Sequence, residues 1–211
     1  MKILSHRGYW RAEEEKNTPV AFRRSFEHGF GLETDIRDFE GELVLSHDMA
    51  NKDSMKLEKF FKGYSGFRRD LPLALNIKTD GLQKRLKELL KKFGVSNYFV
   101  FDMSVPDALA YLKEGLTTFT RQSEYEPVPA FYDEAKGVWI DCFASMWFDE
   151  ETIKGHLRKC KNVCLVSPEL HGREHLPFWN DILRMDIVRG DSLMLCTDHP
   201  EEAGRFFNEK N

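Results

Sequence analysis

The chain has 211 residues, 41% of them hydrophobic, a formal net charge of −4 and an isoelectric point near 6.0. This length suits one domain with a full core, and the hydrophobic fraction is typical of a folded chain rather than a disordered one. The small negative charge argues against a nucleic-acid binder, which would normally carry a basic face. We therefore expect a single globular domain over residues 1–211.

No membrane or secretory segment is evident. No apolar stretch approaches the ~20 residues that span a bilayer, and the first five residues lead directly into His6 without the apolar core of a signal peptide. Cys142, Cys164 and Cys196 lie in apolar runs typical of buried thiols. Because Cys160-x3-Cys164 lacks a second pair of zinc ligands, a reduced cytoplasmic protein is the simplest expectation.

Short apolar or β-branched runs, bounded by Gly, Pro, Asp or Ser, recur along the chain and are typical of strands. The eight expected strands are Lys2–Ser5, Gly31–Arg37, Leu73–Ile77, Tyr98–Asp102, Thr117–Thr120, Val138–Cys142, Val163–Ser167 and Ser192–Thr197.

Between these runs lie patterns typical of amphipathic helices. Thr18 followed by Pro19 indicates an N-cap and a first helical position. An apolar stripe predicts another helix, and its members are Leu82, Leu86, Leu89, Leu90 and Phe93. Further helices are expected at Pro106–Lys113, Glu150–Lys159, Leu176–Met185 and Pro200–Asn208. The segment Arg121–Lys136 shows no helical stripe.

Eight strands, each followed by a helix-length segment, predict a compact (β/α)8 TIM barrel. In such a barrel the active site lies at the C-terminal ends of the strands. The polar residues expected there are His6, Glu33, Asp35, Asn76, Lys78, Asp102, Arg121, Asp141, Glu169 and Asp198. Packing alone does not explain such a gathering.

Glu33 and Asp35 are two apart on one expected strand, so their side chains point to the same side of the sheet. Two adjacent carboxylates repel, and a divalent cation removes the conflict. Ligation by oxygen atoms suits Mg²⁺ or Ca²⁺. The alternative is a salt-bridged pair neutralised by Arg7 or Arg37.

His6 and His47 are the two histidines best placed for proton transfer, because imidazole titrates near neutral pH. The planar guanidinium of Arg7 matches phosphate oxygens, and Lys78 adds a point charge. Arg121 is a further candidate for the substrate pocket. These residues predict a metal-assisted enzyme that cleaves phosphodiesters.

Four motifs occur in order near the start of the chain: His6-Arg7-Gly8, Asn17-Thr18-x-x-Ala21-Phe22, Gly31-x-Glu33-x-Asp35 and His47-Asp48. A fifth, Thr197-Asp198-x-Pro200, follows at the far end. Together they resemble the glycerophosphodiester phosphodiesterase family. The resemblance implies a (β/α)8 barrel and a divalent metal. It also implies that His6 and His47 form the acid–base pair, that Glu33 and Asp35 are metal ligands, and that Arg7 binds phosphate.

The chain departs from the family pattern in three places. Asn76-Ile77-Lys78 stands where the family has an acidic metal ligand in an E-x-K pattern, so weaker metal binding is expected. Asp102 could replace that carboxylate. Lys16 stands where the family usually has a glutamate, and the segment between His47 and Asn76 is short.

The expected substrate is a small-molecule or lipid-head-group phosphodiester, with a glycerophosphodiester as the first candidate. Two alternatives stay open: a barrel that binds a phosphorylated ligand without turnover, and a lyase of the sphingomyelinase D type that forms a cyclic phosphate. The oligomeric state is open as well, since the aromatic rings of Phe60, Phe61, Tyr64 and Phe67 suit either a core or a partner surface.

Overall fold

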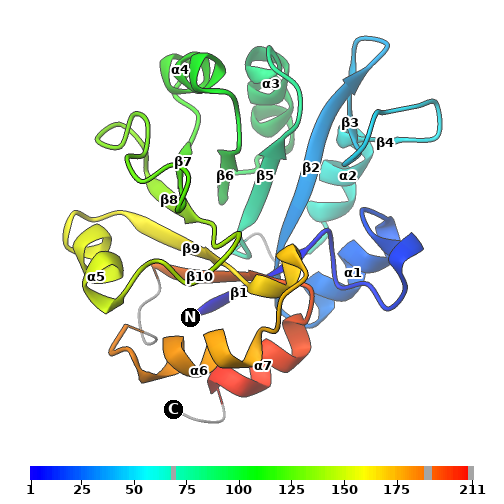
Figure 1. The fold of residues 1–211 in the computed structure, drawn as a ribbon. Coiled ribbons are helices and arrows are strands. Elements are labelled where there is room, and N and C mark those ends of the chain that lie inside the picture. The colour runs from blue at the N-terminus through cyan, green and yellow to red at the C-terminus, as the bar shows by residue number, and fades with distance from the viewer. Residues whose placement is uncertain (68–69, 188–191, 209–211) are drawn as a thin grey trace. The chain divides into compact units, whose positions relative to one another are not determined.

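Strands and helices alternate along most of the chain in the computed structural model, which describes residues 1–67, 70–187 and 192–208 (Figure 1). The chain divides into two compact units. The first unit comprises His6–Thr118, and the second comprises Met1–Ser5 together with Phe119–Asn211. The expectation of a single domain stays a prediction.

The first unit contains a five-stranded sheet and four α-helices. Its sheet has the order β4-β3-β2-β5-β6, in which β3 pairs antiparallel with β2 and β4, and β5 pairs parallel with β2 and β6. The strands are β2 (Gly31–Phe39), β3 (Glu42–Leu45), β4 (Met55–Lys56), β5 (Leu73–Ile77) and β6 (Tyr98–Phe101). The helices are α1 (Pro19–Glu27), α2 (Leu57–Tyr64), α3 (Gln83–Phe93) and α4 (Val105–Lys113), preceded by a short 3-10 helix, η1 (Glu13–Glu15).

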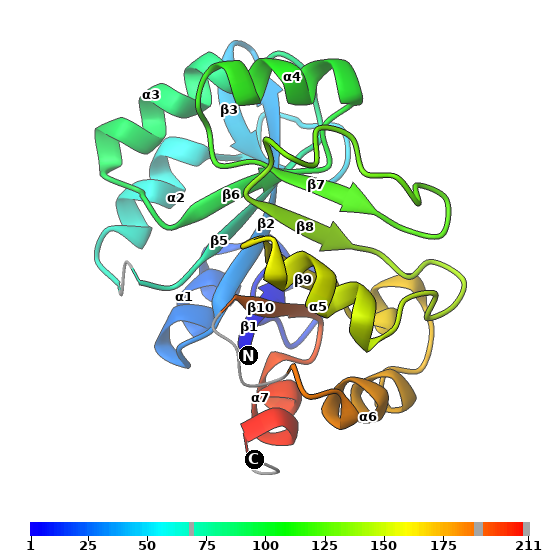
Figure 2. The same cartoon turned by 90° about the vertical axis from the view of Figure 1, so that its left-hand side faces the viewer.

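One face of this sheet forms the hydrophobic core of the first unit. The helices α1, α2 and α3 lie against it (Figure 2). On β2 the core positions are Leu32 and Ile36, which alternate with Glu33 and Asp35. Since side chains along a strand alternate between the two faces, the carboxylates lie on the face opposite the core.

The second unit is built on parallel strands in the order β1-β10-β9-β8-β7. The strands are β1 (Lys2–His6), β7 (Phe119–Gln122), β8 (Gly137–Ile140), β9 (Asn162–Val166) and β10 (Leu193–Thr197). The helices are α5 (Glu150–Arg158), η2 (Pro168–His171), α6 (Leu176–Arg184) and α7 (Pro200–Asn208). Helices α6 and α7 lie side by side (Figures 1 and 2). The buried ring of Trp179 on α6 contacts Phe206 and Phe207 on α7.

All eight expected strands occur within two residues of their predicted bounds. The strand expected at Thr117–Thr120 is present as β7, displaced by two residues to Phe119–Gln122. At its first residue, Phe119 pairs with Gly137, and a Cβ on residue 137 would lie 2.4 Å from the Phe119 ring, so this pairing requires glycine.

The pattern of elements between β2 and β5 differs from the expectation. Strands β3 and β4 and helix α2 were not predicted. The aromatic rings of Phe60, Phe61 and Tyr64 belong to the buried face of α2, so they form core. Thr18 does stand at the N-cap of α1, but its hydroxyl donates to the Glu15 carbonyl instead of accepting from the helix.

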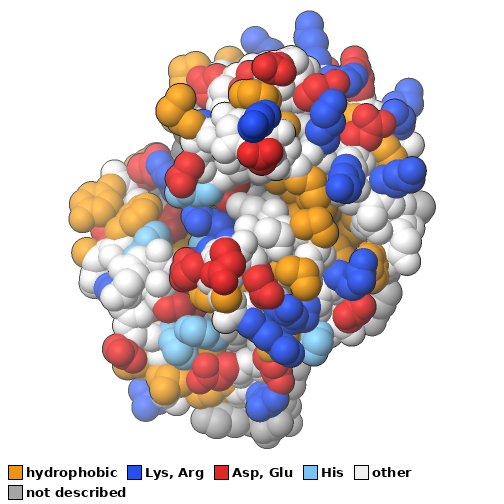
Figure 3. Space-filling model, turned by 90° about the vertical axis from the view of Figure 1, so that its right-hand side faces the viewer, with side chains coloured by type: hydrophobic (Ala, Val, Ile, Leu, Met, Phe, Trp, Pro, Cys, Tyr) orange, Lys and Arg blue, Asp and Glu red, His pale blue; other side chains and the backbone are white. Residues whose placement is uncertain are grey.

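The surface carries charges of both signs. On the face in Figure 3, acidic and basic side chains are interspersed, in keeping with the net charge of −4. Within the ranges that the structure describes, no helix combines the length and the apolar character that crossing a bilayer requires.

Candidate active site

Two carboxylates and one amide lie side by side in the first unit. In the pairing of β2 with β5, Glu33 is opposite Ala74, and Asp35 is opposite Asn76. Glu33 and Asp35 are each 1% exposed, and Asn76 is 9% exposed. The side chains of Glu33, Asp35 and Asn76 therefore gather on the face that the core does not use.

The buried pair is electrostatically costly. Burial raises the pKa of Glu33 to about 7, and the charge of Asp35 adds to this effect. The backbone N–H of Arg7 donates to Glu33 Oε2 at 3.1 Å, and His6 Nε2 lies 4.0 Å from the same oxygen. The positive charges of His6, Arg7 and Lys78 lower the pKa of Glu33, but by less than burial and Asp35 raise it.

Asp35 is held by three side chains. Asn17 Nδ2 donates to Asp35 Oδ2 at 2.8 Å, and Arg7 Nε lies 3.2 Å from that oxygen. Lys78 Nζ lies 3.6 Å from Asp35 Oδ1. Asn17 also accepts from the Thr34 hydroxyl at 2.7 Å, so it fixes the strand between the two carboxylates. In the sequence, Asn17 is recognisable only as part of the motif Asn17-Thr18-x-x-Ala21-Phe22, and its contact with Asp35 was not predicted.

The backbone around this cluster adopts unusual conformations. Arg7, Asn17 and Asp102 have positive φ angles of 54°, 57° and 69°, a region in which non-glycine residues are uncommon. At Gly8, with φ 94°, a Cβ would lie 2.6 Å from Ala21 Cβ. Glycine at this position thus lets α1 approach the site loop closely.

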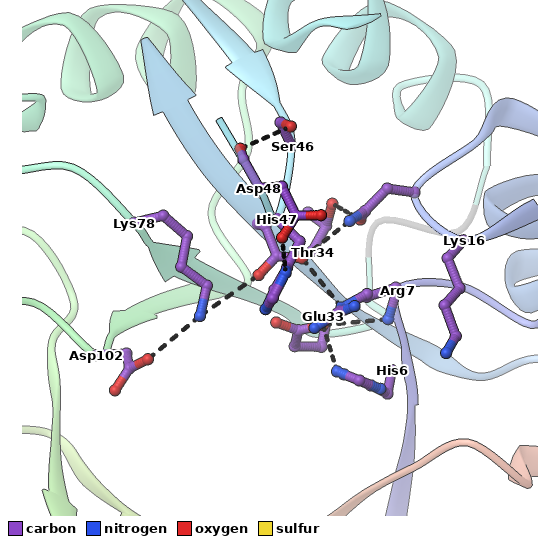
Figure 4. A network of polar contacts seen from close by, with 12 residues as sticks. His6, Arg7, Lys16, Glu33, Thr34, Ser46, His47, Asp48, Lys78 and Asp102 are labelled. Carbon is purple, nitrogen blue, oxygen red and sulfur yellow. Dashed lines mark hydrogen bonds and ion pairs between the residues drawn. The ribbon is translucent and has the colours of Figure 1, made fainter. Parts of the chain in front are cut away.

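His47 reaches the cluster through the β2–β3 hairpin. Leu45 pairs with Ile36, and the next residue, Ser46, donates its N–H to the Asp35 carbonyl. Because β3 runs antiparallel to β2, the chain then carries His47 back toward Glu33. In Figure 4 the rings of His6 and His47 are both directed toward Glu33.

The two rings differ in surroundings. The His47 side chain is 43% exposed, against 15% for His6. His47 Nδ1 lies 2.8 Å from the Asp48 carboxylate, an interaction that lowers the pKa of Asp48. Arg37 donates to the His47 carbonyl at 3.1 and 3.2 Å and so anchors the loop. Arg37 therefore fixes the loop of the second histidine, a role that the sequence did not reveal.

Lys78 and Lys16 play different parts. Lys78 Nζ lies between two carboxylates, 3.6 Å from Asp35 and 3.4 Å from Asp102 (Figure 4). Lys16 Nζ pairs instead with Glu13 at 2.7 Å and lies 4.3 Å from the centre of the Trp10 ring. Lys16 is thus engaged with Glu13 and Trp10.

The donor set fits a divalent cation. Asp35 Oδ1 and Asn76 Oδ1 are buried without a hydrogen-bond partner, which is a cost that ligation would remove. Carboxylate and amide oxygens are ligands that Mg²⁺ and Ca²⁺ accept. In the described part of the chain, no three His, Cys, Asp or Glu side chains form a metal cluster, so a cation at Glu33 and Asp35 would depend on the Asn76 amide oxygen as its next ligand.

The remaining predicted residues lie in the second unit. Arg121 Nε pairs with Glu126, so its assignment to substrate stays a prediction. Asp141 Oδ1 lies 3.1 Å from His171 Nε2. The Glu169 carboxylate accepts from the Asp198 N–H at 3.1 Å.

Comparison with known proteins gives a fold. No protein-family model matches the sequence, and no curated protein matches it either. Among solved structures, a protein of Galdieria sulphuraria, provisionally assigned as a glycerophosphodiester phosphodiesterase, is similar at a TM-score of 0.78 and 20% identity, over 98% of this chain and 97% of that one.

Two further solved structures extend this likeness. The glycerophosphodiester phosphodiesterase of Agrobacterium tumefaciens matches at a TM-score of 0.72 and 13% identity, over 99% of both chains. A Ca²⁺-dependent phosphatidylinositol-specific phospholipase C of Streptomyces antibioticus matches at 0.58 and 8% identity, over 98% of this chain and 95% of that one. The chain thus has the (β/α)8 barrel fold that solved glycerophosphodiester phosphodiesterases share, as its sequence motifs predicted.

Proposed function

We propose that this chain is a divalent-metal-dependent phosphodiester hydrolase that acts on a glycerophosphodiester or on a related phospholipid or polymer head group. One observation carries the proposal: the buried pair Glu33 and Asp35 lies beside a guanidinium, while two imidazoles are directed toward Glu33. The fold shared with glycerophosphodiester phosphodiesterases supports this reaction class. Fold alone would not be enough, because one barrel hosts many chemistries.

The reaction divides between the two histidines. One imidazole accepts the proton of the attacking water while the water oxygen forms a bond to phosphorus. The other imidazole donates its proton to the leaving alcohol oxygen as the P–O bond breaks. The products are a phosphomonoester and an alcohol, and the net proton count of the two rings is restored by exchange with solvent.

The polar residues around the histidines orient the phosphate. The Arg7 side chain, held by Asp35 at 3.2 Å, presents its guanidinium for the phosphoryl oxygens. Asn17 fixes Asp35 and Thr34, so the carboxylates keep their positions as charge develops. Glu33, Asp35 and Asn76, with Asp102 as a further candidate, would hold the divalent metal. When bound, the metal supplies Lewis-acid stabilisation of charge on the phosphoryl oxygens.

The test uses the full-length chain with glycerophosphodiesters of different head groups, followed by phosphorus NMR with Mg²⁺, Ca²⁺ or EDTA. We expect a phosphomonoester that forms only with a divalent metal. His6→Ala and His47→Ala should each slow its formation by about 10²-fold or more. His28→Ala, at the end of α1 with its ring against Phe30, should leave the rate unchanged.

The same spectra separate the alternatives. A cyclic phosphate that accumulates before any monoester would indicate a lyase instead of a hydrolase. Saturable binding of the diesters by calorimetry, with no product after hours, would indicate a binding protein. Turnover that survives both histidine substitutions would refute the assigned roles.

A further inference from the structure

Lys78 holds an unusual position in the site. Its ammonium lies 3.6 Å from Asp35 Oδ1 and 3.4 Å from Asp102 Oδ2. Asp35 Oδ1 is buried, and no donor among the described residues lies within hydrogen-bond distance of it. The lysine is also close in sequence to Asn76, and the side chains of Asn76 and Asp35 are neighbours across the β2–β5 pairing.

The Lys78 ammonium thus places a positive charge beside the buried Asp35 carboxylate. Lys78 leaves β5 one residue after its last position, and its backbone N–H donates to the Ile36 carbonyl at 2.9 Å, so the base of the side chain is fixed. The ammonium, at the end of a flexible four-carbon stem, can still move. Its two acidic neighbours come from different strands, because Asp35 lies on β2 and Asp102 follows β6.

We propose that Lys78 is a tethered competitor of the divalent metal, and that Asp102 is a positioning residue that draws the ammonium away from Asp35 when the metal binds. The inference rests on the metal site of the proposed function. A divalent cation bound at Asp35 Oδ1 and a lysine ammonium 3.6 Å from the same atom repel each other. Metal binding is therefore weakened unless the ammonium moves away. Asp102 offers the ammonium a second carboxylate within reach.

This assignment differs from direct ligation by Asp102. A ligand contributes its oxygen to the metal, and its loss weakens binding in any background. A positioning residue acts through Lys78, so its loss matters only while Lys78 is present. A double-mutant cycle separates the two cases.

The experiment measures the binding of Ca²⁺, and separately of Mg²⁺, to the metal-free full-length chain by calorimetry, without substrate. We expect Lys78→Met to bind Ca²⁺ more tightly by about tenfold or more, since it removes the competing charge. Lys78→Arg, which keeps the charge, should bind as weakly as the unmodified chain. Lys16→Met is the control for a general change in charge, and it should leave the affinity nearly unchanged because that lysine pairs with Glu13.

The cycle is completed with Asp102→Asn. Alone, it should weaken Ca²⁺ binding several-fold, because Lys78 then turns to Asp35. Combined with Lys78→Met, it should have no further effect. Equal weakening in both backgrounds would make Asp102 a metal ligand and overturn its positioning role. Circular dichroism of each variant checks that the chain is folded.

Failure of this inference and failure of the proposed function give different results. If the unmodified chain binds Ca²⁺ or Mg²⁺ and Lys78→Met binds no more tightly, the competitor role of Lys78 is refuted and the metal site stands. If neither the unmodified chain nor Lys78→Met binds either cation, the proposed metal site is refuted. The proposed competition between Lys78 and the metal is then refuted as well. Binding that emerges only in Lys78→Met would support the competition most directly.

Discussion

Replacing Glu33 with glutamine should stabilise the metal-free chain at alkaline pH. The side chain is 1% exposed, and burial together with Asp35 raises its pKa from 4.5 to about 7. The folded state therefore holds the Glu33 proton more tightly than the unfolded state does. The resulting stability is fully present below about pH 4.5 and is lost as the pH rises through about 7.

The size of the effect follows from the pKa values. A rise from 4.5 to about 7 corresponds to about 3 kcal/mol of unfolding free energy, because each pKa unit is about 1.4 kcal/mol. Glu33→Gln keeps the shape of the side chain and cannot ionise. It should match the unmodified chain near pH 4.5 and exceed its stability by up to about 3 kcal/mol above pH 8.

The assay is urea denaturation in EDTA across this pH range, with the difference in unfolding free energy between the two proteins plotted against pH. Titrating groups that do not interact with Glu33 cancel in this difference. Glu14→Gln, an exposed glutamate on η1, is the matched control and should give a flat difference. A flat difference for Glu33→Gln as well would refute the argument that burial of this carboxylate is costly.

Further substitutions probe the rest of the site. His47→Ala should lower kcat by about 10²-fold or more, measured by release of alcohol from a glycerophosphodiester. Asn17→Ala removes hydrogen bonds of 2.8 and 2.7 Å to Asp35 and Thr34 and should lower the unfolding free energy, measured in urea, by about 1–3 kcal/mol. An unchanged free energy would mean that these hydrogen bonds do not stabilise the fold. Gly8→Ala places a Cβ 2.6 Å from Ala21 and should cost about 2 kcal/mol or more by thermal denaturation. Asn76→Asp adds a charge beside Asp35 and should tighten Ca²⁺ binding in calorimetry while lowering the metal-free melting temperature.

The sequence predicted most readily those elements whose signal is local. The strand Leu73–Ile77 was predicted with its observed bounds, because four of its five residues are apolar and every position is buried. Helix α3 was found from its stripe, which ends where Gly94 adopts a left-handed C-cap. The hairpin of β2 and β3 was missed. Its turn is Glu40-Gly41, both with positive φ, and glutamate is not among the residues that usually mark such turns.

The sequence predicted which residues form the candidate site, but only some of the contacts between them. The spacing of Glu33 and Asp35 placed both on one face, and this follows from strand geometry alone. The hydrogen bond from Asn17 to Asp35 depends on the left-handed backbone conformation of Asn17, which cannot be predicted from the sequence around it. The contact of Lys78 with Asp102 joins the ends of two strands, and its existence depends on distances that only folding sets.

The left-handed backbone at Arg7 and Asp102 implies a conflict between fold and chemistry. Such conformations cost about 1–3 kcal/mol for side chains other than glycine, with aspartate among the more tolerant. Mutation toward glycine at either position would relax the main chain, yet it would remove a guanidinium or a carboxylate. Selection for stability alone would therefore favour glycine at these two positions. If Arg7 and Asp102 are kept during laboratory evolution, selection is acting on activity as well as on stability.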